Sequence, residues 1–308
     1  MIVSLLSLLS AGVCLLTAVS YLARRWWIFE LAAHFRVQYV VLLAGCGAAW
    51  LAAGRPFEAA ITLVLAAVNG ADVLFMYRRR APDVTGRPVL RLLMMNVNTA
   101  NRQHDRAVAL ARRAQADVVI VIETDQLWVE RLGALRDLYP FMQAAPRGDG
   151  FGMAVFSRLP VEYHEVMEAG LARLPCQVVR VPLDGKRLTV IGIHPHAPVT
   201  RLHAAGRNEQ LQDVARYVSG TPGPVLVTGD FNCTPWSPHF HDLLRATRLR
   251  DSRHGFGVQP SWPVGFLPLR IPIDHCLVSE GIAVHSRRLG DDVASDHFPI
   301  LVECSIAA

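Results

Sequence analysis

The amino-acid sequence predicts an α/β domain of two packed mixed β-sheets with helices outside them, preceded by an N-terminal helical membrane region. Three observations lead to this prediction. Residues 1–80 contain three long apolar runs. The remaining residues alternate apolar runs of strand length with amphipathic helices. Strands outnumber helices in that part, and several follow one another directly, which favours two packed sheets over one doubly wound sheet.

The composition supports this division of the chain. Of 308 residues, 52% are apolar and only 19% are charged, and the mean hydropathy is +0.27. These values exclude a disordered or collagen-like chain. The formal net charge of +5 is uneven, because residues 1–80 hold seven Arg against three acidic residues, and the rest holds 24 basic against 23 acidic residues. A nearly neutral main domain gives little support for a broad nucleic-acid-binding surface.

Residues 1–80 are interpreted as a membrane region with three transmembrane helices. The apolar runs are Met1–Leu22, Val37–Gly54 and Ala59–Tyr77, and about 20 apolar residues are needed to span a bilayer as a helix. A cleaved signal peptide is the alternative for the first run, and a buried helical pair for the other two. Asp72 inside the third run is either functional or a structural residue that reaches the interface or pairs with Asn69.

The arginines predict the orientation of these spans. Arg24, Arg25 and Arg36 lie between the first and second runs, residues 78–80 are all Arg and follow the third run, and only Arg55 lies on the other side. The three runs predict an integral, multi-pass protein of the inner (cell) membrane. The positive-inside rule then predicts that residues 78–80 and everything after them lie in the cytoplasm, with the N-terminus outside. The extracytoplasmic side is the alternative if one span is not real.

Residues 81–88 contain two Pro and one Gly and are interpreted as a linker, and residues 89–308 as a single domain. Runs of apolar residues predict its strands: Val89–Val97, Asp117–Ile122, Gly152–Phe156, Cys176–Val181, Leu188–His194, Pro224–Thr228, Ile273–Val278, Ile282–His285 and Phe298–Cys304. The run DVVIVI at 117–122 has no polar face after its first residue, so this strand is expected to be buried on both faces.

Helical periodicity predicts the helices of this domain. Arg102–Gln115 places Ala107, Leu110, Ala111 and Ala114 on one face, and Arg207–Val218 has a similar apolar stripe. Leu127–Leu138 is expected to be a third helix. The residues Trp-Ser-Pro-His at 236–239 are expected to form a loop.

Polar residues occupy the ends of five predicted strands. They are Asn96 and Asn98, Glu123, His194, Asp230 and Asn232, and Asp296 and His297. Polar ends on five separate strands indicate one convergent site, because strand ends in a packed sheet share a rim. Carboxylates and amides without a Cys/His cage suit Mg²⁺ or Mn²⁺ rather than Zn²⁺.

The motifs NVN at 96–98, IET at 122–124, GDFN at 229–232, PID at 272–274 and SDH at 295–297 occur in this order. This set resembles the endonuclease/exonuclease/phosphatase superfamily, the DNase I-like group, here as a membrane-anchored bacterial-type member. The resemblance covers approximately Val89 to Cys304. It implies a four-layer α/β sandwich and hydrolysis of a phosphoric ester that requires a divalent metal, Mg²⁺ or Mn²⁺.

The resemblance also implies a metal site. Glu123 would be the principal ligand, Asn96 would lie at the metal and the phosphate, and Asp296 would support the metal directly or through water. Asn98 would assist Asn96 in contacting the substrate.

For catalysis, the resemblance implies that Asp230 orients and deprotonates the attacking water, with Asn232 beside it. His194 would donate a hydrogen bond to a phosphoryl oxygen. His297 would contact the phosphoryl oxygens, and Asp274 would fix its tautomer and its orientation. An Asp hydrogen-bonded to an imidazole raises the basicity of the ring, so this pairing is chemically reasonable.

Three functions compete for this sequence. The leading one is a membrane-anchored, Mg²⁺-dependent phosphoesterase, with the lipid bilayer as a partner and a phospholipid headgroup, a small phosphodiester or a nucleic acid as substrate. No obligate protein partner is evident. The second is a metal-dependent nuclease, and the third is a catalytically silent membrane scaffold. Arg270 is expected to contact phosphate, and Trp262 either stacks on the substrate or packs in the fold.

Overall fold

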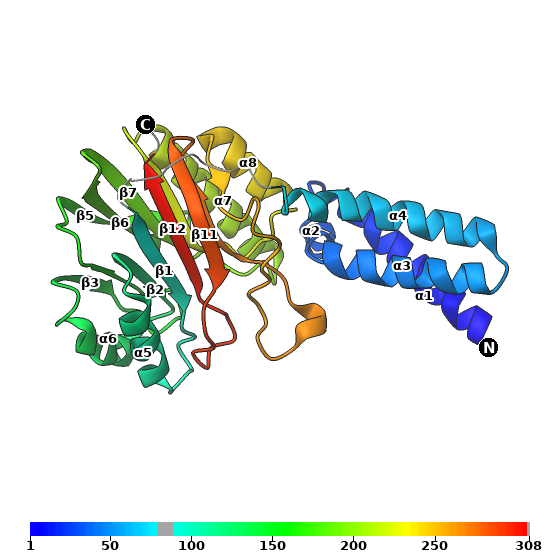
Figure 1. Cartoon of the computed structure of the whole chain (residues 1–308), viewed down its shortest axis with the longest axis horizontal. Helices are drawn as coiled ribbons and strands as arrows, with labels where there is room; N and C mark the ends of the chain where they lie inside the picture. The colour runs from blue at the N-terminus through cyan, green and yellow to red at the C-terminus, as the bar shows by residue number, and fades with distance from the viewer. Residues whose placement is uncertain (79–88, 307–308) are drawn as a thin grey trace.

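The computed structural model describes residues 1–78 and 89–306, and a bundle of helices leads into a globular α/β part (Figure 1). Arg79, Arg80, the predicted linker at 81–88 and residues 307–308 lie outside the described residues. The helices of the N-terminal region are α1 (Ile2–Ser20), α2 (Trp27–Ala33), α3 (Arg36–Ala52) and α4 (Pro56–Phe75).

Two of these helices, α1 and α4, are long and apolar enough to cross a membrane. Helices α2 and α3 are bent by 64° against each other and count as a third span only if they are taken together. Many large apolar side chains of the bundle face outward, and Leu8 and Phe57 are 72% and 74% exposed. Such an apolar outer surface is suited to lipid rather than to water. The helices therefore fit the membrane association that the sequence predicts.

A buried arginine settles the environment of Asp72. The guanidinium of Arg36 donates a hydrogen bond to Asn69 Oδ1 (3.0 Å) and lies 3.6 Å from Asp72 Oδ2. Asp72 therefore pairs with Arg36, and Asn69 binds the same guanidinium. Because this polar group is internally paired, it has a structural explanation that requires no substrate.

The globular part contains two six-stranded mixed sheets. The first has the order β11-β12-β1-β2-β4-β3 and the second the order β5-β6-β7-β8-β10-β9. The first sheet consists of β1 (Leu90–Asn96), β2 (Val118–Ile122), β3 (Phe141–Ala145), β4 (Met153–Ser157), β11 (Ile282–Leu289) and β12 (Ile300–Ile306). The second consists of β5 (Tyr163–Ala169), β6 (Leu174–Leu183), β7 (Lys186–Ile193), β8 (Val225–Asp230), β9 (Arg250–Asp251) and β10 (Asp274–Val278).

The main core lies between these two sheets. Alternate residues such as Leu92 and Ile120 of the first sheet meet Val190 and Leu226 of the second, and all four are buried. Helices α5 (His104–Ala114) and α6 (Gln126–Leu132) cover the outer face of the first sheet, and α7 (Arg201–Ser219) and α8 (Pro238–Thr247) cover that of the second (Figure 1). The order helices, sheet, sheet, helices confirms the predicted four-layer sandwich.

The main departures from the predicted elements lie where the local signals conflict. The expected loop at Trp236–His239 instead leads into α8, because the hydroxyl of Ser237 caps the helix by accepting from the His239 N–H and Pro238 suits the first turn. Strands β3 and β5 were not predicted from the sequence. Both are partly exposed edge strands, and β5 carries the charged residues Glu165 and Glu168. Edge strands lack the continuous apolar signal of buried ones.

Strand direction brings the functional residues to one end of the sandwich. β1 runs parallel to β2 in one sheet, and β7 runs parallel to β8 in the other. The residues that follow β2 and β7, Glu123 and His194, approach to 3.7 Å, so the carboxyl ends of all four strands share one end of the sandwich. β10 is antiparallel to β8 and β12 is antiparallel to β1, so their amino ends reach the same end. The motifs that end four strands and precede two others therefore meet at one place.

Candidate active site

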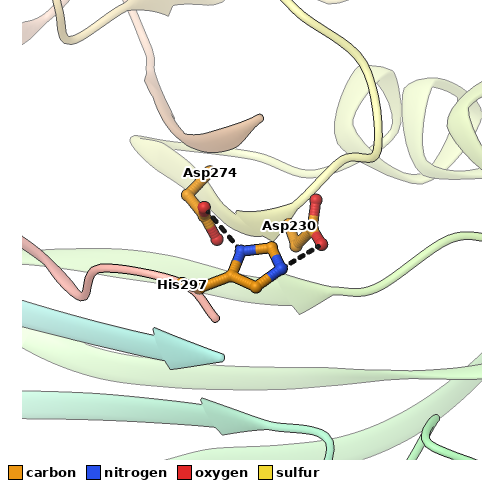
Figure 2. A group of neighbouring side chains, drawn as sticks. All are labelled: Asp230, Asp274 and His297. Atoms are coloured by element: carbon orange, nitrogen blue, oxygen red, sulfur yellow. Dashed lines mark hydrogen bonds and ion pairs between the residues drawn. The ribbon is translucent and has the colours of Figure 1, made fainter. Parts of the chain in front are cut away.

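The centre of this end is a line of three buried side chains, Asp274, His297 and Asp230 (Figure 2). Asp230 and Asp274 lie opposite each other on β8 and β10, so both carboxylates point to the same face of the sheet. His297 Nδ1 donates to Asp274 Oδ2 at 2.9 Å, and His297 Nε2 lies 3.6 Å from Asp230 Oδ2. The imidazole is thus held between two carboxylates.

The charges of this line are strongly coupled. Burial disfavours the imidazolium of His297, but Asp274 and Asp230 outweigh that effect and raise its pKa to about 10. Burial raises the pKa of Asp230 well above its usual value, with a further contribution from Asp274, and His297 only partly opposes this. The site therefore combines a protonated imidazole with a carboxylate of increased basicity.

Glu123 stands directly after β2 and faces the same site. Its Oε1 accepts a hydrogen bond from Asn96 Nδ2 at 2.8 Å, and the hydroxyl of Thr99 donates to its backbone carbonyl at 2.8 Å. Burial raises the pKa of Glu123, although the hydrogen bond from Asn96 opposes the shift. Asn96 at the end of β1 therefore orients the Glu123 carboxylate, which has little positive charge near it.

His194 lies between the two acidic groups. Its Nε2 is 3.7 Å from Glu123 Oε1 and 3.8 Å from Asp230 Oδ2. Burial, and to a smaller degree the charge of His297, lower the pKa of His194 to about 3. At neutral pH this ring is uncharged, so it acts as a hydrogen-bonding group rather than as a cation.

The backbone at the site adopts conformations that most side chains avoid. Asn98, Glu123 and Asn232 have φ of 55°, 64° and 50°, and non-glycine residues in this region cluster at functional sites. Gly229 has φ +149°, and a Cβ there would lie 1.8 Å from the carbonyl oxygen of Ile193. The glycine of the GDFN motif is therefore required where β8 approaches β7.

This tight approach also positions the loop after β8. The backbone N–H of Asn232 donates to Asp230 Oδ1 at 2.8 Å, and its Nδ2 donates to the carbonyl of Pro195 at 2.9 Å. Asn232 is thus fixed between the loops that follow β7 and β8, with its own backbone orienting the Asp230 carboxylate.

Asp296 lies at the exposed side of the site. Asn98 Nδ2 donates to its Oδ1 (2.8 Å) and Trp262 Nε1 donates to its Oδ2 (3.0 Å). Its pKa is lowered because the charge of His297 and these two hydrogen bonds outweigh the effect of burial. Asn98 and Trp262 therefore fix the orientation of the Asp296 carboxylate.

Arg270, expected to contact phosphate, faces elsewhere. Its guanidinium donates to the backbone carbonyls of Pro263 (3.1 Å) and Val264 (2.5 Å) and stacks over the ring of Phe298. It does not line the cavity at the site. In this structure Arg270 stabilises the loop that carries Trp262, because its hydrogen-bonding capacity is directed at that loop.

A cavity of about 630 Å³ opens in front of these residues. Glu123, His194, Asp230, Asn232, Trp262, Asp296 and His297 all line it. So do Leu31, His34 and Phe35, from the bend between α2 and α3. Sequence reasoning assigned that segment only to the membrane region. Its one local signal was Glu30 and His34 within an otherwise apolar stretch.

The donor set suits a hard divalent cation. Ligand atoms of Asp230, Asp274 and His297 lie within 4.8 Å of one another, although Nδ1 of His297 and Oδ2 of Asp274 already bind each other. Asp274 Oδ1 is buried without a hydrogen-bond partner among the described residues. Glu123 and Asp230 both have raised pKa values, which indicates too little nearby positive charge. Oxygen ligands with uncompensated charge are what Mg²⁺ and Mn²⁺ bind.

Comparisons with known proteins agree with the geometry. A model of the Endonuclease/Exonuclease/phosphatase family matches residues 95–297, more than half of the chain. A comparison with curated proteins finds no sequence match.

Solved structures show the same fold. Humanized D. rerio TDP2 has a TM-score of 0.60 at 15% identity and covers 70% of this chain and 99% of its own. An endonuclease/exonuclease/phosphatase family protein from Bacteroides thetaiotaomicron has a TM-score of 0.60 at 16% identity, with 72% and 99% covered. The beta toxin of Staphylococcus aureus has a TM-score of 0.53 at 20% identity, and the match covers 69% of this chain and 99% of the toxin chain.

Proposed function

The chain belongs to the endonuclease/exonuclease/phosphatase family and is a metal-dependent phosphoric ester hydrolase, and from this premise we propose that it is a membrane-anchored, Mg²⁺-dependent phosphoesterase. The observation that carries the proposal is the line Asp274–His297–Asp230, of which His297 and Asp230 line one cavity together with Glu123. A buried base beside a charged imidazole, with the Glu123 carboxylate available to a metal ion, is suited to hydrolysis of a P–O bond.

The metal would be held by Glu123 as the main ligand, with Asn96 and Asp296 nearby. Mn²⁺ is the alternative ion, because both prefer carboxylate and amide oxygens. When bound, the ion supplies positive charge to the phosphoryl oxygens and to the leaving oxygen. The hydrogen bond from Asn96 to Glu123 fixes the carboxylate in the orientation in which it faces the cavity.

Asp230 is the proposed general base. The raised pKa makes it a stronger base than an exposed Asp, and the N–H of Asn232 holds Oδ1 so that Oδ2 faces His297 and the cavity. The water oxygen forms the new P–O bond, its proton passes to Asp230, and the bond to the ester oxygen breaks in line. The leaving oxygen then takes a proton from solvent. General-base help of this kind contributes typically about 10²–10⁴-fold.

His297 and His194 are proposed to bind the phosphoryl group in different ways. With a pKa of about 10, His297 is an imidazolium at neutral pH and stabilises charge that develops on the phosphoryl oxygens. Asp274 holds its ring through Nδ1, so Nε2 points toward the reacting group. His194 is neutral and donates or accepts a single hydrogen bond.

The membrane part of the proposal is supported by the helices. α1 and α4 each meet the length and hydropathy of a span. The N-terminus and the α3–α4 turn lie at the end of the bundle far from the globular part, and the α1–α2 connection lies near it (Figure 1). Arg24 and Arg25 are therefore on the same side as the hydrolase part, while Arg55 is on the opposite side. With the positive-inside rule, this arrangement supports a cytoplasmic hydrolase domain.

The full-length protein in detergent micelles tests the function. It should hydrolyse bis-p-nitrophenyl phosphate in the presence of Mg²⁺ or Mn²⁺, and EDTA should stop the reaction. The Asp230→Asn variant, prepared in the same way, is the control against a contaminating phosphatase. No turnover with any divalent ion would support the silent scaffold instead.

A nuclease is the second candidate, because another solved structure of this fold, D. rerio TDP2, is complexed with single-strand DNA product. Nicking of a supercoiled plasmid by the full-length protein, at a kcat/KM comparable to that for small diesters, would favour this activity. The cavity argues against it: among the described residues that line it there is no Lys or Arg, and four are acidic. Binding to nucleic acid depends on many basic contacts to phosphates.

A further inference from the structure

The bend between the membrane helices forms one wall of the active-site cavity. We use the term elbow for residues 31–35, which lie between Glu30 in α2 and Arg36 at the start of α3. Leu31, His34 and Phe35 of the elbow line the cavity together with the catalytic side chains. The family match begins only at residue 95, so this wall is an addition of this chain to the shared fold.

The elbow is fixed to the hydrolase part by buried polar contacts. Glu30 is 1% exposed and accepts hydrogen bonds from Arg207 Nη2 and from Ser237 Oγ, both at 2.5 Å. His34 Nδ1 lies 3.1 Å from Thr234 Oγ1. Arg207 in turn donates to the backbone carbonyl of Asn232 at 3.1 Å. The wall is therefore attached to the loop that carries Asn232.

The cavity lining combines polar and apolar side chains. Glu123, His194, Asp230 and His297 supply the polar groups. The remaining lining includes Leu31, Phe35, Pro198, Val199, Ile271 and Ile273, all of them apolar. The acidic lining residue Asp149 is already paired with Arg147. The cavity therefore suits a ligand with one phosphate and an apolar extension.

Apolar side chains also surround the approach to the cavity from the side of the helices. Val199 lines the cavity and is 66% exposed. The loop that carries Trp262 continues into the short 3₁₀ helix η2 (Leu267–Leu269), where Phe266 and Leu267 are exposed. Gln38 of α3 donates to the backbone carbonyls of Pro268 and Arg270 of this loop. The loop therefore lies against the membrane helices. Exposed apolar residues beside such helices are suited to the surface of a bilayer.

We propose that the cavity binds a phosphate ester that carries a hydrocarbon chain and that reaches the site from the bilayer holding α1, α3 and α4. The phosphate lies at Asp230 and His297, and the hydrocarbon lies along Leu31 and Phe35. This inference rests on the proposed phosphoesterase function. The elbow is the specificity-determining element, because among residues 1–78 it is the segment that lines the cavity.

A series of alkyl p-nitrophenyl phosphates from methyl to octyl tests the apolar wall, since only the chain length varies while the leaving group stays the same. With the full-length protein in detergent and Mg²⁺, kcat/KM should rise by at least about 10²-fold from methyl to octyl, because each buried methylene contributes up to about fourfold. A flat series with measurable turnover of the methyl ester would overturn the inference but leave the phosphoesterase intact. No turnover of any ester would refute the phosphoesterase itself.

Variants of the elbow make this test specific. Phe35→Ala and Phe35→Leu should lower the octyl-to-methyl ratio of kcat/KM, the Ala variant by about tenfold or more, in line with about two buried methylenes. Leu202→Ala, which changes an exposed apolar residue outside the cavity lining, should leave the ratio unchanged. Two variants at Phe35 are used so that a folding defect in one does not decide the result. An unchanged ratio in both would contradict the role of the elbow.

The bilayer route needs a separate measurement. Dioleoylphosphatidyl p-nitrophenol is placed either in the nanodisc that holds the protein or in separate protein-free nanodiscs. Turnover should require the shared nanodisc, because this lipid exchanges slowly through water. Equal turnover from separate nanodiscs would overturn the route through the bilayer.

Discussion

At the scale of single residues, the site depends on charges that the fold holds in an unfavourable environment. Asp230 and Glu123 are carboxylates whose pKa values are raised by burial, and His297 is the only cationic group between them and Asp274 among the described residues. Such an arrangement costs stability in the absence of a metal. It also places a carboxylate of raised pKa, an imidazolium and further carboxylates for a cation within one small volume.

Asp230→Asn separates catalysis from folding. The variant should lower kcat by at least about 10²-fold, because the general base is lost. The folded-state pKa of Asp230 is raised, so its ionisation at neutral pH favours the unfolded chain. Without metal, the variant should therefore unfold at the same or a higher temperature than the parent. A loss of activity below tenfold would mean that Asp230 is not the base.

His297→Ala should also lower kcat by at least about 10²-fold. Because Asp274 acts through the His297 ring, the double variant with Asp274→Asn should be hardly slower than His297→Ala alone. Steady-state kinetics of the two single variants and the double variant measure this. Full additivity of the two losses would show that Asp274 acts independently of His297.

At the scale of elements, the position of α2 determines how the two parts of the chain fit together. The ion pair between Glu30 and Arg207 is almost completely buried, whereas the pair between Arg24 and Asp242 is 53% and 44% exposed. Both join the N-terminal helices to the hydrolase part. Only the first is continued to the site, through the hydrogen bond from Arg207 to the carbonyl of Asn232.

Glu30→Gln should therefore destabilise the protein strongly. Removing one partner of a buried pair leaves the other charge uncompensated, at a cost of about 3–5 kcal/mol. Arg24→Gln is the matched control, and because its pair is exposed, its loss should cost below about 1 kcal/mol. Thermal unfolding in the same detergent compares the two. Equal shifts in the midpoint would contradict the structural role of Glu30.

For the same reason, hydrolase domains that lack the helices are unsuitable for measuring the activity. Residues 89–306 alone would leave Arg207 and Ser237 without the carboxylate of Glu30 that binds them both. They would also lack the cavity wall that Leu31 and Phe35 form. The full-length chain in detergent or nanodiscs is the appropriate material.

At the scale of the whole molecule, the bundle and the sandwich form one functional unit if the cavity is filled from the bilayer. The bundle presents apolar side chains outward, and the end of the sandwich that carries the site faces the elbow. A membrane anchor that also forms part of the active site would limit the enzyme to substrates in its own membrane. Two further properties of the whole chain can be tested: its requirement for metal and its orientation in the membrane.

The first property is the requirement for metal. Dialysis against EDTA should abolish turnover of bis-p-nitrophenyl phosphate by the full-length protein, and Mg²⁺ or Mn²⁺ should restore it. Binding of Mn²⁺ can be followed independently by its electron paramagnetic resonance signal. Glu123→Gln should weaken that binding. Undiminished activity after removal of all divalent ions would exclude a metal-dependent mechanism.

The second property is orientation. A fusion of alkaline phosphatase to the C-terminus should be inactive in cells, and a fusion of green fluorescent protein at the same position should be fluorescent, because the C-terminal part is proposed to be cytoplasmic. Alkaline phosphatase works only outside the inner membrane. An active phosphatase fusion would reverse the proposed topology.

The sequence by itself determined the α/β class, most strands of the sandwich and the set of polar residues at the strand ends. These features depend on local order: an apolar run forms a strand, and the residue after it lies at the edge of the sheet. Asn96, Glu123, His194 and Asp230 are selected by this local rule alone. The apolar runs within residues 1–80 predicted the membrane region for the same reason.

Only the tertiary structure decided which distant segments meet. Glu30 and Arg207 are 177 positions apart, Asp72 pairs with Arg36, and Arg270 turns away from the cavity to bind its own loop. The wall formed by Leu31 and Phe35 also follows from packing between two regions that the sequence presents as separate. Hydropathy and periodicity report how each segment is buried, but they carry no information about which surface buries it.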